Sequence, residues 1–574
     1  MNPFTHRKSP LRPGLLDMVS GYDRRTAAAD ATAGAITAIL LIPQGMAYAL
    51  LAGLPAQYGL YAAIFPPAVY ALFGTSRTLA VGPVAVAALM VADALGGYAA
   101  TQAEWIEGAI VLSAEVGALL FIGGLLGLGR LVAFVSHPVL CGFTSAAALL
   151  ILISQMGDLL GIDMQRGTAP VMLEALAQRL GSIDSATVWT AAAAIAALLL
   201  GRQPARRALE RLGIAHNAAL LMTRACPLLI VVAATMGVAW IAGDGAPPVA
   251  VVGEIPGGLP TPGAGLLRAS GWIELLPSAA LIALIGYVES ITVARVLAAR
   301  RRERVDPTRE LVALGLANAG AALAGTMPAA GGFSRSVVND EAGARTQVAA
   351  LITAALVAIV ALWFTAWFAT LPRAVLAAII VVAVVQLINL REARSIISVD
   401  RGDGVTLVLT FVTVLVLGIE PGLVTGIGLS LLIYVWRTSR PHMAVVGRVP
   451  GTEHFRNVER HRVEGHSGVV IVRIDENIYF ANTEAIRDFL LDAIGRSDTT
   501  RYLVLAMTSV SYVDSSGVSL LDNLQSELED RGVELHLAEV KGPVADRLAG
   551  VPALERLFAE RVHLSLEQAV ERLQ

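Results

Sequence analysis

The sequence has little charge, few aromatic residues and almost no lysine or cysteine. Of its 574 residues, 16% are charged and 6% are aromatic, whereas 55% are hydrophobic and the mean hydropathy is +0.65. No basic tract of the kind that neutralises phosphates is present, which argues against nucleic acid as a partner. A chain this long and this apolar is too large for one soluble domain, so the composition predicts a protein that crosses a membrane many times.

Several kinds of functional site are missing as well. The two cysteines, Cys141 and Cys226, lie in apolar segments, which argues against an extracellular disulfide framework. No set of His, Cys and Glu residues has the spacing of a metal site. There is no Gly-rich lysine loop for ATP, and no enzyme nucleophile stands out. We therefore expect a protein that is not an enzyme, has no metal or organic cofactor and is not driven by ATP.

Charge is distributed unevenly along the chain. Residues 441–574 contain 14 basic and 21 acidic residues, as in a soluble domain, whereas the first 440 residues contain only 29 basic and 25 acidic residues. No small-residue cleavage site follows the polar N-terminal stretch, so a cleaved signal peptide is not expected. The predicted order is a cytoplasmic tail (1–26), a transmembrane domain (27–437), and a linker with a cytoplasmic domain (438–574).

The apolar runs predict fourteen transmembrane segments, because a helix needs about 20 apolar residues to cross a bilayer. Residues 31–74 include no charged side chain and are long enough for two segments, broken near Leu54-Pro55. Several other runs are short or interrupted by Gly and Pro, as expected where helices are broken around a buried site. The remaining segments are expected near 79–96, 108–129, 132–160, 184–201, 217–242, 273–299, 311–326, 328–342, 347–369, 374–390, 404–419 and 421–437.

The arginines indicate the orientation of these segments. They cluster at 202–211, 300–309 and 391–401, in loops that fourteen segments place on the cytoplasmic side together with both termini. Seven segments followed by seven that start on the opposite side predict two inverted repeats, 27–242 and 273–437, with substrate binding at the midplane. Weak echoes at an offset of roughly 245 residues align Gln44 with Glu289 and Pro83 with Pro328.

Two short segments resemble half-helices. Gly82-Pro83 precedes one helix-forming run, and Gly331-Gly332 precedes another that starts at Phe333 and Ser334. Each would present free backbone N–H groups, and a helix N-terminus acts like about half a positive charge. Two such ends facing each other would form a site for a small anion.

Arg335 follows 24 uncharged residues and would lie at membrane depth. A charge there is costly unless it meets water, a partner or a ligand. We therefore expect Arg335 to attract the anion. The alternative is a structural arginine paired with Glu289 or with carbonyl oxygens.

Glu289 is the other charge placed strongly within an apolar segment. Low dielectric favours the protonated carboxyl, so this group could bind and release a proton during transport. The alternative is a fixed ion pair with Arg295 or Arg335. Glu115 and Arg224 also lie in apolar runs, but we interpret both as structural.

Gln44 and Tyr48 are four residues apart and share one helix face, where they could line a polar cavity. Hydrogen bonding between helices is an equally good interpretation of that spacing. His137-Pro138 is interpreted as the start of a helix.

The C-terminal region alternates strands and helices. Strands are expected at 469–474, 502–506 and 533–537, and helices at 483–494 and 517–531. Ser515 or Ser516 is expected to cap the second helix, and phosphorylation of Ser515 is a weaker alternative.

The stretch 43–61, PQGMAYALLAGLPAQYGLY, with ALFGTSR at 71–77 and VGP at 81–83, resembles the sulfate permease (SulP) family. Phe333-Ser-Arg-Ser fits that family, and Asp514-Ser-Ser-Gly resembles the STAS domains of anti-sigma-factor antagonists. The resemblance implies the α-helical fold of uracil permease, with fourteen segments in 7+7 inverted repeats forming a core and a gate domain, plus a cytoplasmic α/β STAS domain. It also implies elevator-like motion and homodimers. We further expect the protein to lie in the inner (plasma) membrane of a bacterial cell.

The resemblance implies anionic substrates of the sulfate, bicarbonate or dicarboxylate class. Carried over by motif, the substrate site uses Gln44 and Tyr48, the backbone around Val84, and Phe333, Ser334 and Arg335. Glu289 matches the acidic residue associated with proton coupling. A proton-coupled symporter is therefore the first prediction, and a sodium-coupled symporter, an uncoupled exchanger or channel, and a sensor with a cytoplasmic partner at the STAS domain are the alternatives.

Overall fold

The computed structural model describes residues 14–18, 22–129, 135–165, 167–201, 203–213, 216–243, 245–260 and 270–574. Most of the predicted N-terminal tail, Arg202 and residues 261–269 of the connection between the repeats lie outside these ranges. The chain forms two compact units, Met1–Gly428 and Leu429–Gln574. The division falls inside one long helix, nine residues before the predicted end of the transmembrane domain.

The first half of the helical unit follows the predicted order of segments. Its first predicted break is confirmed, because one helix ends at Leu51 and the next begins at Ala56, directly after Pro55. The elements are α1 (Gly14–Met18), α2 (Arg24–Leu51), α3 (Ala56–Ala62), α4 (Phe65–Phe73), β1 (Val81–Gly82), α5 (Ala85–Gly96), α6 (Gln102–Leu125), α7 (His137–Ser154), α8 (Met156–Leu160), α9 (Ala169–Gln178), η2 (Leu180–Ser182), α10 (Ser185–Leu200), α11 (Gln203–Arg211) and α12 (His216–Ala242).

The second half repeats this order, with a long helix pair followed by a short strand and a half-helix. The elements are α13 (Trp272–Arg300), α14 (Pro307–Leu323), β2 (Ala330–Gly331), α15 (Phe333–Glu341), α16 (Val348–Trp363), η3 (Thr365–Phe368), α17 (Arg373–Val384), η4 (Val385–Leu387), α18 (Leu390–Val399), α19 (Arg401–Leu417) and α20 (Ile419–Thr438). The helices α9, α11 and α18 between the apolar segments were not predicted.

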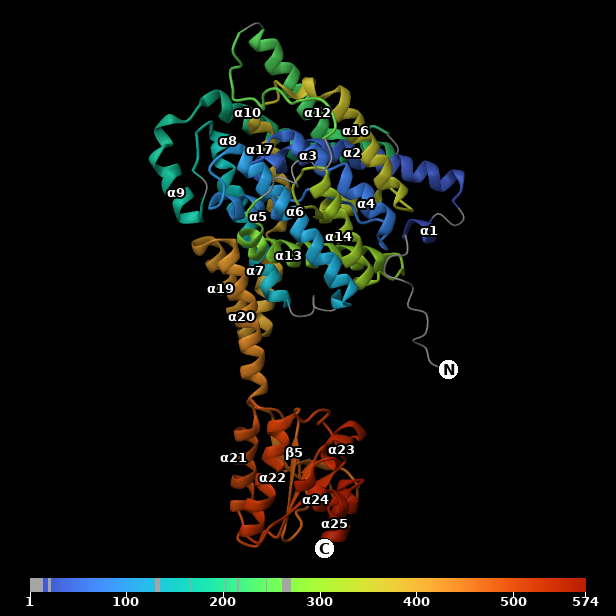
Figure 1. The fold of residues 1–574 in the computed structure, drawn as a ribbon, viewed down its shortest axis with the longest axis vertical. Helices are drawn as coiled ribbons and strands as arrows, with labels where there is room; N and C mark the ends of the chain where they lie inside the picture. Colours follow the sequence, from blue (N-terminus) through green and yellow to red (C-terminus); the bar gives the residue numbers. More distant parts are fainter. Residues whose placement is uncertain are drawn as a thin grey trace. The chain divides into compact units, whose positions relative to one another are not determined.

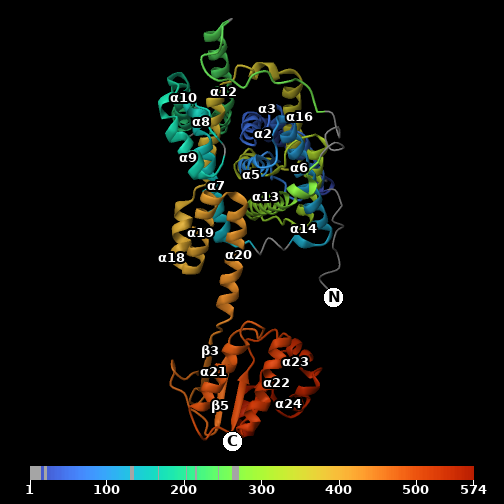
Figure 2. The same ribbon diagram turned by 60° about the vertical axis from the view of Figure 1, so that its left-hand side comes forward.

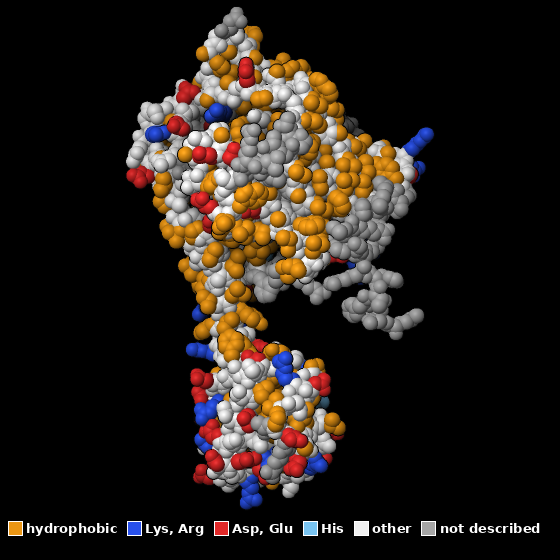
Figure 3. Space-filling view, viewed as in Figure 1, with side chains coloured by type: hydrophobic (Ala, Val, Ile, Leu, Met, Phe, Trp, Pro, Cys, Tyr) orange, Lys and Arg blue, Asp and Glu red, His pale blue; other side chains and the backbone are white. Residues whose placement is uncertain are grey.

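Within the described ranges, seven helices are individually long and apolar enough to cross a membrane, or eight if one bent pair counts as a single span. The other predicted segments are shorter or broken, such as α3 with α4, and α5 with β1. They have the form expected for helices interrupted inside a membrane protein. Figure 3 shows hydrophobic side chains over much of the visible surface of the helical unit, as expected for contact with lipid.

Small residues bring the central helices together. In Figures 1 and 2, α6, α13 and α14 lie side by side. A Cβ atom added at Gly117 of α6 would lie 2.8 Å from the backbone nitrogen of Ala319, and one at Gly315 of α14 would lie 2.5 Å from that of Phe121. Only glycine permits this close approach of the two backbones, which is typical of helix packing in membranes.

The second unit contains a six-stranded sheet with strand order β4-β3-β5-β6-β7-β8. The strands β5 to β8 are parallel, and hydrophobic clusters cover both faces of the sheet. The predicted strands and helices are confirmed to within two residues. The elements are β3 (Met443–Arg448), β4 (Phe455–Asn457), β5 (Val469–Ile474), α21 (Thr483–Gly495), β6 (Tyr502–Ala506), α22 (Ser515–Asp530), β7 (Glu534–Ala538), α23 (Gly542–Ala549), η5 (Pro552–Leu554), α24 (Glu555–Glu560), β8 (Val562–His563) and α25 (Leu566–Leu573).

The predicted serine cap of α22 is wrong. Asp514 is the N-cap, and its Oδ1 accepts a hydrogen bond of 2.8 Å from the Gly517 backbone N–H. Ser515 is the first helical residue. A carboxylate already satisfies the helix end here, so Ser515 has no capping role.

Candidate functional site

Two broken segments meet at the centre of the helical unit. The strands β1 and β2 pair antiparallel, with Val81 opposite Gly331 and Gly82 opposite Ala330. Each strand leads within two residues into a helix, α5 or α15. The pairing therefore brings the N-termini of both half-helices to the same place, as the sequence predicts.

Further hydrogen bonds fix this crossing. The Gly332 backbone N–H donates to the Ala80 carbonyl at 3.1 Å, and the Ala80 N–H donates to Ser336 Oγ at 2.9 Å. Ser290 Oγ of α13 accepts from the Gly331 N–H at 2.7 Å. Because β1 and β2 share one set of hydrogen bonds with α13 and α15, a shift of one segment disturbs the other.

The two helix N-termini carry no side-chain caps. Val84 is the N-cap of α5 and Gly332 that of α15, and neither has a side chain that accepts from the first turn. The first N–H groups of a helix have no partner within it. They are therefore available to an anion at this point.

Arg335 lies on α15 beside both ends and is 3% exposed. Its Nη1 donates to the Pro83 carbonyl, so the structural alternative is met in part. Its Nε and Nη2 have no hydrogen-bond partner within the described part of the chain. A buried guanidinium with two unpaired donors is suited to receive an anion.

Glu289 lies on α13 and is half-buried. Its carboxylate forms neither a hydrogen bond nor an ion pair with any described residue, including Arg295 and Arg335. Arg335 and Tyr48 are nevertheless close enough to interact with it electrostatically. The three titratable groups thus surround the same region.

The remaining predicted residues come from α2 and the start of α15. Tyr48 is buried and Gln44 is half-buried, and neither side chain forms a hydrogen bond to a described residue. Phe333 is 48% exposed, and Ser334 is exposed as well. The predicted set therefore combines a buried cation with accessible polar and aromatic groups.

Sequence reasoning missed the side chains that position this site. Glu310 of α14 accepts hydrogen bonds from Tyr70 Oη at 2.7 Å, from the N–H groups of Thr75 and Ser76 at 2.7 and 3.1 Å, and from Thr75 Oγ1 at 2.5 Å. It thereby fixes the segment that leads to β1. Glu310 follows Arg309 in the first turn of α14, where acidic residues are common, so the sequence does not set it apart.

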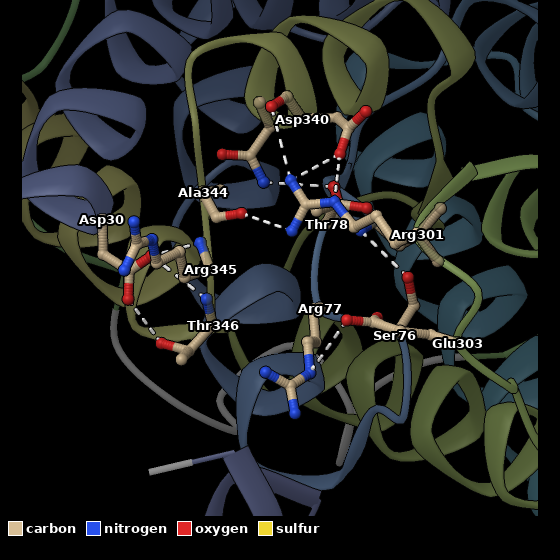
Figure 4. Close-up of polar contacts among 12 residues, drawn as sticks. Asp30, Ser76, Arg77, Thr78, Arg301, Glu303, Asp340, Ala344, Arg345 and Thr346 are labelled. Carbon is tan, nitrogen blue, oxygen red and sulfur yellow. Dashed lines mark hydrogen bonds and ion pairs between the residues drawn. The ribbon is translucent and has the colours of Figure 1, made fainter. Parts of the chain in front are cut away.

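A second group of buried polar contacts fixes the end of α15 (Figure 4). Arg301, the residue directly after α13, donates to Asp340 Oδ1 at 2.6 Å and to the Ala344 carbonyl at 2.7 Å. Asp30 of α2 accepts from the N–H groups of Arg345 and Thr346 at 2.6 and 3.1 Å, and from Thr346 Oγ1 at 2.5 Å. These bonds join α2, α13 and α15 into one framework around the candidate site.

Two other residues, His137 and Arg224, were interpreted from the sequence alone. His137 begins α7 and is followed by a proline in the first turn, as expected for a helix start. Arg224 is a residue of α12, and its side chain lies outside the described part of the chain. Within the described ranges, no three His, Cys, Asp or Glu side chains form a group that could hold a metal ion.

Comparison with known proteins decides the family. Residues 28–410 match the model of the sulfate permease family, and residues 460–569 match that of the STAS domain. This chain belongs to the sulfate permease family.

Relatives match over nearly the whole chain. The chain is 37% identical to sulfate transporter 4.1, chloroplastic, of Arabidopsis thaliana, covering 95% of this chain and 80% of that one. It is 33% identical to a probable sulfate transporter of Mycobacterium tuberculosis, covering 97% of both chains.

Solved structures agree in fold. The murine anion transporter Slc26a9 in its inward-facing state matches with a TM-score of 0.89 and 25% identity, covering 100% of this chain and 96% of that one. The transmembrane domain of the cyanobacterial bicarbonate transporter BicA matches in fold with a TM-score of 0.58 and 23% identity, over 70% of this chain and 98% of its own.

These matches confirm the predicted fold, with fourteen segments in 7+7 inverted repeats and a C-terminal STAS domain. They also confirm a multi-pass membrane protein that transports anions and is not an enzyme, because the relatives are transporters.

Proposed function

We propose that this member of the sulfate permease family carries sulfate, or an anion of similar size and charge, together with protons. The observation that carries the proposal is the pair of unsatisfied charges at the crossing of β1 and β2. Arg335 has two unpaired guanidinium nitrogens, and Glu289 interacts with it electrostatically but has no ion-pair partner. Sulfate is preferred because the named relatives, 37% and 33% identical, are sulfate transporters.

The anion would bind between the N-termini of α5 and α15. The backbone around Val84 and the guanidinium of Arg335 supply positive charge, while Gln44, Tyr48 and Ser334 supply hydrogen bonds. Phe333 covers one side of the site. The assignment of these roles rests on position, because each group belongs to an element that begins or passes at the crossing.

Glu289 couples the anion to a proton. When ionised it competes for Arg335 and repels an incoming anion, whereas the neutral acid does neither. Protonation therefore favours anion binding, and by thermodynamic reciprocity anion binding favours protonation to the same extent. If the binding site changes sides mainly when it is empty or when it holds both the anion and the proton, the protein is a symporter.

The hydrogen-bonded framework of α2, α13 and α15 suits movement of the whole site as one body. Polar contacts at Asp30 and Arg301 connect these elements, and Glu310 of α14 holds the segment before β1, so the site residues keep their mutual positions when the body slides. This supports alternating access of the elevator type. The homodimer and the bacterial inner-membrane location belong to the same proposal.

The test is uptake of labelled sulfate into proteoliposomes with and without an inward proton gradient. Glu289→Gln removes the titratable group and keeps its shape, so binding of sulfate should survive while acceleration by the gradient is lost. Glu274→Gln is the matched control, because Glu274 is an exposed carboxylate on the same helix. Bicarbonate, chloride and dicarboxylates are then compared as competitors.

Other outcomes reject parts of the proposal. Proton dependence that persists in Glu289→Gln rejects the coupling role of Glu289. Uptake that follows a sodium gradient, or exchange that needs no gradient, would show one of the alternative mechanisms. Failure of sulfate to compete with another anion rejects the substrate.

A further inference from the structure

The helical unit contains a buried carboxylate, Glu115, that takes no part in the proposed coupling. Asp30, Glu115 and Glu310 are the only acidic residues below 9% exposure in the described part of the chain. Glu115 is 6% exposed and lies in the middle of α6, thirteen residues after the helix begins. At 1.5 Å per residue it is about 20 Å along the helix, near the middle of a bilayer.

Glu115 differs from the other two buried carboxylates in having no partner. Glu310 accepts four hydrogen bonds and Asp30 accepts three, including bonds from backbone N–H groups. No described residue donates to Glu115, and its Oε2 is fully enclosed without a partner. Its neighbour Ser113 is satisfied by the carbonyls of Ala109 and Thr326.

No charge compensates Glu115 either. It lies in a helix that contacts α5, α13 and α14, and no described charged side chain forms an ion pair with it. Glu310 is already saturated, and Glu289 interacts with Arg335 instead. The titratable and charged groups on α6 and on the three elements packed against it are Glu104, Glu107, Asp93, Glu274, Tyr287, Glu289, Arg295, Arg300, Arg309 and Glu310.

An ionised carboxylate in this position would bear the full penalty of desolvation without any compensating contact. The neutral acid avoids most of that penalty, so Glu115 carries a proton in this conformation. Asp30 and Glu310 differ from Glu115, because each accepts several hydrogen bonds from described donors. Glu115 is thus chemically distinct from the two structural carboxylates, Asp30 and Glu310.

The helix of Glu115 also borders the elements of the anion site. The adjacent Val116 lines a small cavity together with Ala87 of α5, Gly286 of α13 and Ala330 of β2. Ala87 follows Val84 by three residues, and Gly286 precedes Glu289 by three, so the cavity lies about one helical turn from the site. Movement of α5 or α13 during transport therefore changes the packing of α6 near Glu115.

We propose that Glu115 is a second proton-binding site of the transporter, which is loaded in the present conformation and releases its proton when packing around α6 changes. This inference rests on the proposed proton coupling and extends it. When Glu289 and Glu115 are both protonated, two protons cross the membrane with each divalent anion, and their charges cancel those of the anion. Transport of sulfate would then be insensitive to membrane potential.

The experiment measures protons moved per sulfate in proteoliposomes, from the sulfate gradient that just balances a set proton gradient. Glu115→Gln imitates the neutral acid and should reduce the ratio by one proton per anion, with uptake becoming dependent on membrane potential. Glu107→Gln on the same helix, outside the buried stretch, is the control and should leave the ratio unchanged. Infrared difference spectra of the wild type should contain the carbonyl stretch of a protonated acid that is absent from Glu115→Gln.

An unchanged ratio and unchanged voltage dependence in Glu115→Gln would overturn the inference, as would the absence of the carboxylic acid band. If Glu115→Gln does not fold, the proton ratio of the wild type still decides, because a ratio of one proton per sulfate rejects a second site. Sulfate uptake by the wild type that does not depend on a proton gradient would instead reject the proposed function. The infrared band at Glu115 is independent of that result.

Discussion

Acidification is expected to destabilise the STAS domain through a pair of buried histidines. His536 of β7 and His563 of β8 are 5% and 3% exposed, and Nδ1 of His536 lies 3.1 Å from Nε2 of His563. His536 Nε2 is 3.6 Å from Glu534 Oε2, and Arg561 lies nearby at 9% exposure. Burial, followed by the neighbouring His563, lowers the pKa of His536 to about 4.

The sign of the effect follows from proton linkage. The unfolded chain binds a proton at His536 with a pKa of about 6.5, whereas the folded domain does so only near pH 4. Well above pH 7 both states are unprotonated and the histidine contributes nothing to the pH dependence. Stability is therefore lost as the pH falls from about 6.5 to about 4, with a loss of about 2 kcal/mol at about pH 5 and about 3 kcal/mol at completion.

Hydrogen exchange of the full-length protein in detergent measures this loss locally. Peptides that cover β6 and β7 should exchange faster at about pH 5 than at about pH 7.5, after correction for the intrinsic rate, by roughly 30-fold if opening of the domain limits exchange. His536→Gln should remove most of the effect. His461→Gln, at an exposed histidine in the same domain, should behave as the wild type. Equal acid sensitivity of all three proteins would refute the reasoning.

Three further substitutions test the helical unit. Gly332→Ala places a Cβ atom 3.0 Å from Nη2 of Arg335 and should displace the guanidinium. Gly332→Ala and Arg335→Ala, each as a single substitution, should weaken sulfate binding by at least about tenfold, on the order of 1.4 kcal/mol. The control Gly96→Ala, whose added Cβ has no atom within 4 Å, should not weaken it. Titration calorimetry measures this, and unaltered affinity would make Arg335 structural. Asp30→Ala leaves the N–H groups of Arg345 and Thr346 without their acceptor and should cost about 3 kcal/mol, seen as a lower melting temperature in detergent. The control Asp163→Asn, at an exposed carboxylate, should leave the melting temperature unchanged. An equal fall of the melting temperature in Asp30→Ala and Asp163→Asn would count against the role of Asp30.

The apolar pattern was sufficient to predict the order of segments, because each helix in lipid must satisfy its own backbone. Pro55 marked the first break, and Gly82-Pro83 and Gly331-Gly332 marked the half-helices. The amphipathic helices α9, α11 and α18 were missed because their charges interrupt the apolar runs on which the prediction depended.

The residues of the candidate site were only partly predictable from the sequence. Arg335 and Glu289 could be singled out because isolated charges in apolar segments are costly. The bond from Arg335 to the Pro83 carbonyl, and the contacts of Asp30 and Glu310, join residues more than 230 positions apart, and spacing along the chain contains no information about them. The cap of α22 was misassigned because Asp514 and Ser515 are both good capping residues, and only the backbone geometry distinguishes them.

The small sheet of β1 and β2 has a consequence for biogenesis. Its hydrogen bonds join chain positions as far apart as Ala80 and Ser336, 256 residues in sequence. When the first repeat leaves the ribosome, the backbone groups around residue 80 have no second strand to pair with, and lipid offers them none. The nascent first half must therefore wait in a hydrated or chaperoned environment, and the transport pathway is completed only after the tenth segment has been inserted.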